Sequence, residues 1–169
     1  MSQNDRSLGI QIDAKELAGV IRQLDRAKIN IGEPAIAREI RQVVLADVDE
    51  RFATAPSVES GGVVYGGVYW APLSPSTLAQ RPERSGGQLL RDTGETQQSF
   101  TGNGAVFRSG FNEVIVGTAL PKARGLHGGV FWGISRPELA RPLIFVHDQL
   151  ADDVVEAIAL AFDKAQRQA

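Results

Sequence analysis

The residue types that most often do chemistry are sparse in this chain. His127 and His147 are its two histidines, and neither has the His-x-x-x-His or carboxylate spacing of a metal site. Ser109 lacks the Gly-x-Ser-x-Gly context of a nucleophile elbow and falls where a hairpin turn is expected. The glycine pairs are not followed by the Gly-Lys-Ser/Thr of a phosphate-binding loop. We therefore expect no catalytic, metal-binding or cofactor-binding residue, and no cofactor.

The triplet Asp92-Thr93-Gly94 has the residue types found in aspartic proteases, where two such carboxylates share a proton. This chain has one copy, so a symmetric dimer would have to supply the second. Arg91 precedes the triplet and Glu95 follows it, whereas such an active site needs apolar strand residues there. A hydrolase centred on Asp92 is kept as an alternative.

Composition limits the classes of function. The 169 residues are 43% hydrophobic and 22% charged, which is usual for a globular domain with a real core. With 18 basic and 20 acidic residues the net charge is −2, which argues against a dedicated nucleic-acid binder. The chain has no cysteine, so disulfides and thiolate sites are excluded. Without a signal peptide or an apolar run of membrane-spanning length, we expect synthesis in the cytoplasm and no membrane partner.

The N-terminal third predicts one strand and two amphipathic helices. Leu8, Ile10 and Ile12 alternate with small or polar residues, as in a half-buried strand. Asp13 is a suitable N-cap for a first helix. Pro34 suits the first turn of a second. The apolar stripe of that second helix is Ile36, Ile40, Val43, Val44, Val48 and Phe52.

The stretch from Ala53 to Tyr69 combines glycine pairs with apolar residues. It is either a short hairpin turning on Gly66-Gly67 or an arm that becomes ordered against a neighbouring subunit. Ser74 and Pro75 then begin a short helix that Pro82 ends.

The second half predicts a hairpin, a long loop and a final helix. A short helix is expected over 95–100, and strands over 105–108 and 113–116 are joined by a turn. Residues 119–142 are expected to form a loop, and Asp148 to cap a long helix. The prediction is one α+β domain, 1–169, with three main helices on a small antiparallel sheet and flexible loops at about 53–69 and 119–142.

Four patches in order resemble the virion morphogenesis (tail-completion) family of tailed phages. They are Trp70-Ala71-Pro72-Leu73-Ser74-Pro75-Ser76-Thr77, Leu90-Arg91-Asp92-Thr93-Gly94, the strand ending Val116-Gly117-Thr118, and Arg141-Pro142. The family's usual tyrosine between residues 121 and 136 is absent here. The resemblance covers roughly residues 34–150.

This resemblance implies a non-enzymatic virion protein in the neck, which completes or caps the tail so that it joins the head. It also implies a ring-shaped homo-oligomer, commonly a hexamer, next to connector or adaptor, tail terminator or tail tube proteins, with genomic DNA passing nearby. A ring needs two different patches on each subunit, and we expect the two loops to supply them. The predicted interface residues are Val63, Val64, Tyr65, Tyr69, Trp70, Phe131, Trp132, Arg136 and Arg141. A head-assembly factor that leaves the finished particle is the alternative.

Overall fold

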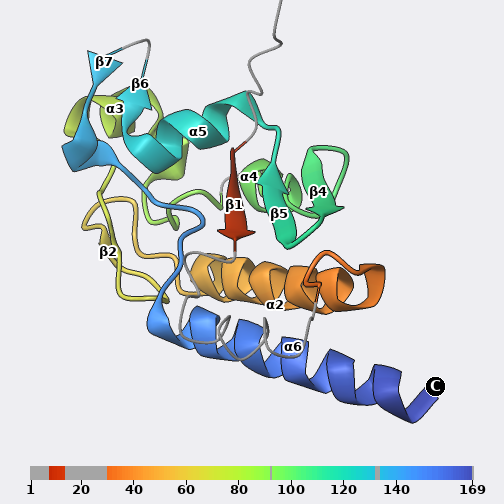
Figure 1. The fold of residues 1–169 in the computed structure, drawn as a ribbon. Helices are drawn as coiled ribbons and strands as arrows, with labels where there is room; N and C mark the ends of the chain where they lie inside the picture. The colour runs from red at the N-terminus through yellow and green to blue at the C-terminus, as the bar shows by residue number, and fades with distance from the viewer. Residues whose placement is uncertain (1–7, 14–29, 92, 132–133, 169) are drawn as a thin grey trace, which may run out of the picture.

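The chain is an α+β domain, as predicted. The computed structural model describes residues 8–13, 30–91, 93–131 and 134–168. In Figure 1, helix α2 (Pro34–Ala53) lies between a three-stranded antiparallel sheet and helix α6 (Asp148–Gln168). The helix expected after Asp13 falls on residues 14–29, outside the described ranges. None of the helices in those ranges is long and apolar enough to cross a membrane.

The sheet has the order β1 (Leu8–Asp13), β5 (Glu113–Thr118), β4 (Ala105–Gly110), so the hairpin predicted from sequence is confirmed. Val116 on the central strand is paired with Ile10 on one side and Phe107 on the other. The connection is a tight turn, in which only residues 111 and 112 separate the strands, because β4 includes Ser109 and ends at Gly110.

Helices α2 and α6 bury the apolar stripes that their sequences show. Pro34 is at the start of α2, where its missing N–H removes no hydrogen bond. Asp148 is the first residue of α6 rather than its cap. The buried apolar residues are Ile36, Ile40, Val44, Val48 and Phe52 on α2, with Leu150, Val154, Ile158 and Ala161 on α6.

The glycine-rich stretch forms the short hairpin, which is one of the two structures that its sequence predicts. Strand β2 (Gly62–Val63) pairs with β3 (Tyr69–Trp70), and Val64 N donates to Val68 O at 2.9 Å. Gly66 and Gly67 both have positive φ, which glycine adopts without steric strain.

Two short helices follow the hairpin. The Ser74 hydroxyl accepts a hydrogen bond from Thr77 N at 3.2 Å and caps α3 (Pro75–Gln80), as predicted. A 3₁₀ turn, η1 (Pro82–Arg84), comes next. Helix α4 (Glu95–Gln98) begins after Gly94, whose φ is +68°.

The prediction of a loop over 119–142 was wrong for its first half. Helix α5 (Pro121–Gly128) occupies it, followed by β6 (Val130–Phe131), β7 (Ile134–Ser135) and the 3₁₀ turn η2 (Pro137–Leu139). Two glycines concealed the helix, since each lowers helix propensity by about 1 kcal/mol relative to alanine. Burial of Ala123 and the proline at its first position offset that cost.

Candidate functional site: a buried clasp and an acidic groove

A buried set of polar contacts fixes the segment 141–147 before α6. We call its members Asp47, Arg51, Trp70, Arg141 and His147 the clasp. At the start of the segment, Trp70 Nε1 donates to Pro142 O at 2.9 Å. Arg141 donates from Nε to Ala71 O and from Nη2 to Pro72 O, both at 2.9 Å. Burial lowers the pKa of the Arg141 guanidinium, and these two carbonyls replace the water it has lost.

The other half of the clasp centres on Arg51, which is fully buried. Its Nη2 donates to Asp47 Oδ2 at 2.5 Å and its Nη1 donates to Leu143 O at 2.8 Å. Asp47 Oδ1 lies 2.6 Å from His147 Nε2, so one carboxylate joins α2 to the residue before α6. Burial lowers the pKa of Arg51, and the Asp47 charge opposes that shift. The guanidinium also lies 4.1 Å from the centroid of the Phe145 ring.

Both histidines are bonded to other parts of the fold. His147 packs edge-on to Tyr65, with 5.4 Å between ring centroids. In the part of the chain described, its side chain bonds to Asp47 and to no hydroxyl group. His127 Nδ1 accepts from Leu143 N at 3.2 Å, and burial followed by the Arg51 charge lowers its pKa. Across the same residues no three His, Asp or Glu side chains gather as metal ligands.

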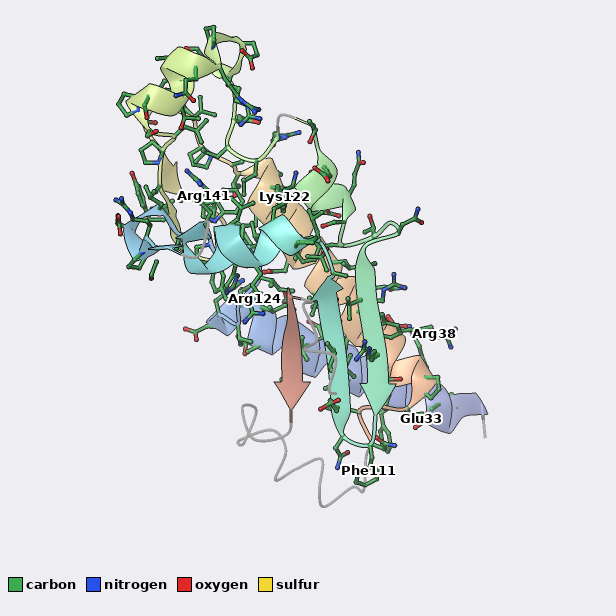
Figure 2. All side chains as sticks on the ribbon, turned by 90° about the horizontal axis from the view of Figure 1, so that it is seen from above. Glu33, Arg38, Phe111, Lys122, Arg124 and Arg141 are labelled. Atoms are coloured by element: carbon green, nitrogen blue, oxygen red, sulfur yellow. The ribbon has the colours of Figure 1, made fainter. Side chains whose placement is uncertain are left out.

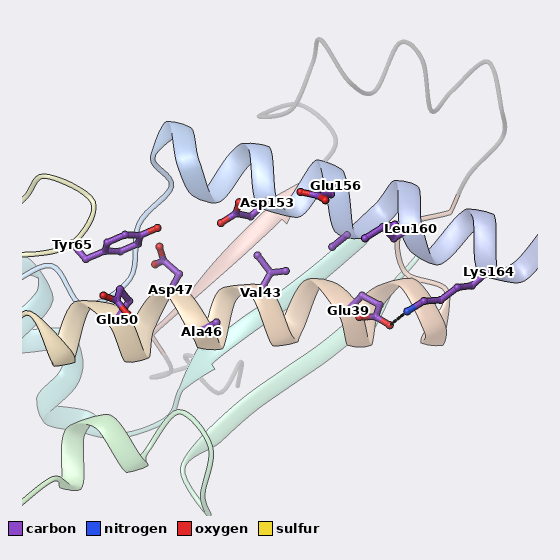
Figure 3. Close-up of a pocket in the computed structure, with 11 residues that line it drawn as sticks. Glu39, Val43, Ala46, Asp47, Glu50, Tyr65, Asp153, Glu156, Leu160 and Lys164 are labelled. Atoms are coloured by element: carbon purple, nitrogen blue, oxygen red, sulfur yellow. Dashed lines mark hydrogen bonds and ion pairs between the residues drawn. The ribbon is translucent and has the colours of Figure 1, made fainter.

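An open groove runs between α2 and α6 and has a volume of about 570 Å³. Figure 3 shows Tyr65, Asp47 and Glu50 at one end, Glu39 and Lys164 at the other, with the strands behind the helices. Its apolar lining consists of Val43, Ala46, Ala157 and Leu160. Leu160 has 53% of its surface exposed, which is unusual for a leucine inside a concave surface.

The groove carries negative charge. Among the described residues, five carboxylates line it, on Glu39, Asp47, Glu50, Asp153 and Glu156, and Lys164 is the one cation of that lining. Lys164 pairs with Glu39 at 3.3 Å, so its positive charge is balanced by that carboxylate at one end of the groove. At the other end, partial burial and then the charges of Asp47, Asp153 and Glu50 raise the pKa of the Tyr65 hydroxyl.

The structure separates the predicted interface residues into three groups. Val64, Trp70 and Arg141 are buried within the subunit, so their prediction as interface residues is corrected: they pack or bond inside it. Val63 and Tyr69 are exposed on the hairpin, Arg136 is exposed and pairs with Glu138 at 3.6 Å, and Tyr65 lines the groove. Phe131 is described by its backbone in β6, while Trp132 and Asp92 lie outside the described residues.

Comparisons with family models, curated proteins and solved structures find no match. The clasp connects segments distant in the chain, and the groove is a concave surface with an apolar lining and a charged rim.

Sequence reasoning missed Asp47 and Arg51, although a signal was present. Both lie on the same face of α2 as Val44 and Val48, at spacings of three and four residues. Two opposite charges four residues apart on an apolar stripe indicate a buried ion pair. The third member, His147, is 100 positions away from Asp47 and gave no such signal.

Proposed function

We propose that this chain is a structural virion protein of a tailed phage, located in the neck, where it completes or caps the tail so that it joins the head. One observation carries the proposal. Two of the patches that resemble the tail-completion family are in direct contact, since Trp70 bonds to Pro142 and Arg141 bonds to Ala71. Their contact supports the proposal, because patches about 70 positions apart in the chain form one buried feature.

A non-enzymatic role accompanies this proposal. In support of it, two of the polar residues that sequence offers as catalysts, His127 and His147, hold the segment before α6. We also propose that copies form a ring, a hexamer as the resemblance implies, beside connector and tail proteins and close to the DNA. Separate surfaces on one subunit, the exposed hairpin residues and the groove, support an assembly of this kind.

The gene product can be tested in the phage or prophage that encodes it. Inactivating the gene should yield filled heads and complete tails that stay separate in electron micrographs, and supplying the gene in trans should restore joined particles. Joined, infectious particles in its absence would overturn the proposal.

Mass spectrometry of purified particles distinguishes the alternative functions. The neck role requires the polypeptide in the finished virion, whereas an assembly factor would be absent from it. An Asp92→Asn variant should support particle formation as the wild type does, and a complete failure would favour the hydrolase alternative.

A further inference from the structure

We propose that copies of this chain contact one another head to tail, with the Phe111 tip of one copy inserted into the α2–α6 groove of the next. The inference rests on the ring-forming role proposed above and gives that ring a specific contact. It uses two features that the fold itself leaves unexplained: the most exposed of the large apolar side chains and the groove described above.

Phe111 has 83% of its surface exposed at the end of the β4–β5 hairpin. Figure 2 shows it projecting from the tip of the two strands, beyond Glu33 and Arg38 of the same end of the molecule. The neighbouring turn residue, Asn112, has a positive φ, which is usual for asparagine at a turn. Because Phe111 packs on little of its own subunit, its apolar ring adds little to the stability of the fold.

The tip is held in place, which distinguishes Phe111 from a scattered surface hydrophobe. Asn112 N donates to Asn30 Oδ1 at 3.0 Å, connecting the turn to the loop before α2. Gly32 lies so close to Gly110 that a Cβ on it would be 1.5 Å from the Gly110 carbonyl oxygen. A rigid aromatic on a fixed hairpin loses little conformational entropy when it becomes buried in a partner.

The groove has the size and lining to receive such a side chain. Glu39 and Glu50 are eleven positions apart on α2, so the groove extends over about 16 Å. An aromatic side chain buries about 150–250 Å² when it is enclosed. The exposed Leu160 and the small side chain of Ala46 provide an apolar surface with room above it.

Charge complementarity favours a second copy of this chain as the occupant. At the end of the subunit that bears Phe111, the side formed by α2 and β4 carries Arg38, Arg41 and Arg108. The acidic residues of this end are Glu33, Glu113 and Asp13, and Asp13 lies on the opposite edge strand β1. Arg41 lies over the Phe107 ring at 5.1 Å, which ties these arginines to the hairpin. Opposite them would be the groove carboxylates of Glu50 and Glu156, for which no ion pair is seen within the described residues.

The contact has to be between subunits. Within one subunit the groove opens away from the sheet, with the strands behind the helices in Figure 3, and the tip is bonded to its own α2 loop. A tip and a groove at different places on one chain make a heterologous contact, which closes into a ring when the rotation between copies allows it.

The absence of cysteine permits a clean cross-linking test on the full chain. In a Ser109→Cys, Ala46→Cys variant, both exposed side chains change little in size, and Phe111 is retained. If the contact forms, mild oxidation should give a ladder of disulfide-linked multimers. A disulfide needs Cα atoms within about 7 Å, so copies that do not bring the two cysteines together should stay unlinked. Adding Phe111→Ser should reduce the cross-linked fraction by about tenfold or more.

Two controls make the result specific. A mixture of the single variants Ser109→Cys and Ala46→Cys should give disulfide-linked dimers and nothing larger, since each chain then carries a single thiol. The pair Ser109→Cys and Ser60→Cys, with the second cysteine on an exposed loop elsewhere, should give no ladder. A ladder equal to that of this control pair, or one unchanged by Phe111→Ser, would overturn the contact.

Failure of the contact and failure of the proposed function would look different. If the polypeptide is present in virions and needed for joining while the ladder is absent, the neck role stands and the Phe111 contact is wrong. If the ladder forms but the polypeptide is missing from particles, the self-contact stands and the neck role is wrong.

Discussion

A buried arginine destabilises a fold unless its N–H donors find acceptors. Arg51 satisfies this condition with one carboxylate and two backbone carbonyls, those of Leu143 and Tyr65. Because these partners come from three separate segments, one side chain on α2 fixes both the hairpin and the approach to α6. We therefore expect the loss of Arg51 to affect stability across the subunit.

Replacing Arg51 with methionine should lower the free energy of unfolding by roughly 3–5 kcal/mol, because Asp47 would remain buried without its cation. Denaturation in urea measures the loss. The matched control is Arg38→Met, at an exposed position on the same helix, where a change within about 0.5 kcal/mol is expected. Similar losses in both variants would contradict the role given to Arg51.

Glu59 makes stability depend on acid pH. Its carboxylate accepts from the Ser57 hydroxyl, from Gly86 N at 2.6 Å and from the Ser85 hydroxyl at 2.9 Å, and these bonds lower its pKa to about 2 from the usual 4.5. The folded state thus disfavours protonation, so this contribution is present above pH 4.5 and is lost as the pH falls toward 2.

A Glu59→Gln variant should therefore show a shallower decline in unfolding free energy between about pH 4.5 and 2 than the wild type. Thermal melts at a series of pH values measure the decline. Glu83→Gln, at an exposed position on η1, is the control and should keep the wild-type slope. An identical slope for Glu59→Gln would mean that the bonds to Ser57 and Gly86 do not persist in solution.

At the scale of elements, the β2–β3 hairpin packs on the clasp through its turn. A Cβ on Gly66 would lie 2.9 Å from both His147 and Phe145, whereas a Cβ on Gly67 would meet nothing within 4 Å. The two glycines share positive φ and differ in their neighbours. Alanine substitutions at the two positions therefore distinguish the cost of backbone strain from the cost of a steric clash.

Gly67→Ala should cost about 1–2 kcal/mol of unfolding free energy, from the left-handed backbone alone. Gly66→Ala should cost a further 1–3 kcal/mol or so, because the methyl group displaces His147 or Phe145. Chemical denaturation of the two variants in parallel gives the difference. Equal costs would show that the hairpin turn does not pack on the clasp in solution.

At the scale of the whole molecule, α6 presents one face to the interior and another to the groove. Ile158 is buried on a helix that packs against α2, and Leu160, two positions along, lines the groove with 53% exposed. Subunit stability and association between subunits are therefore expected to depend on different side chains of the same helix.

Ile158→Ala should lower the unfolding free energy by about 2–5 kcal/mol, because it leaves a cavity between the helices. Leu160→Ala should change it by no more than about 0.5 kcal/mol and should instead weaken self-association. Urea denaturation and sedimentation velocity measure the two effects. A large loss of stability in Leu160→Ala would place that side chain in the core.

Local chemistry determined much of this fold from sequence alone. The Ser74 cap, Pro34 at the start of α2, the apolar stripes of α2 and α6 and the β4–β5 hairpin each depend on residues within a few positions of one another. Such interactions leave a periodicity or a cap that can be recognised before any tertiary contact is known. Helix α5 was not predicted, because its glycines weaken the local pattern and its stability comes from packing.

Only the tertiary structure decided which apolar and charged side chains are buried inside the subunit and which stay exposed. The sequence predicts Trp70 and Arg141 as interface residues. In the structure both are buried, and each donates a hydrogen bond to a backbone carbonyl about 70 positions away. The groove likewise exists because α2 and α6, more than 90 positions apart, pack side by side. Burial depends on residues distant in the chain, and no local sequence pattern specifies which residues those are.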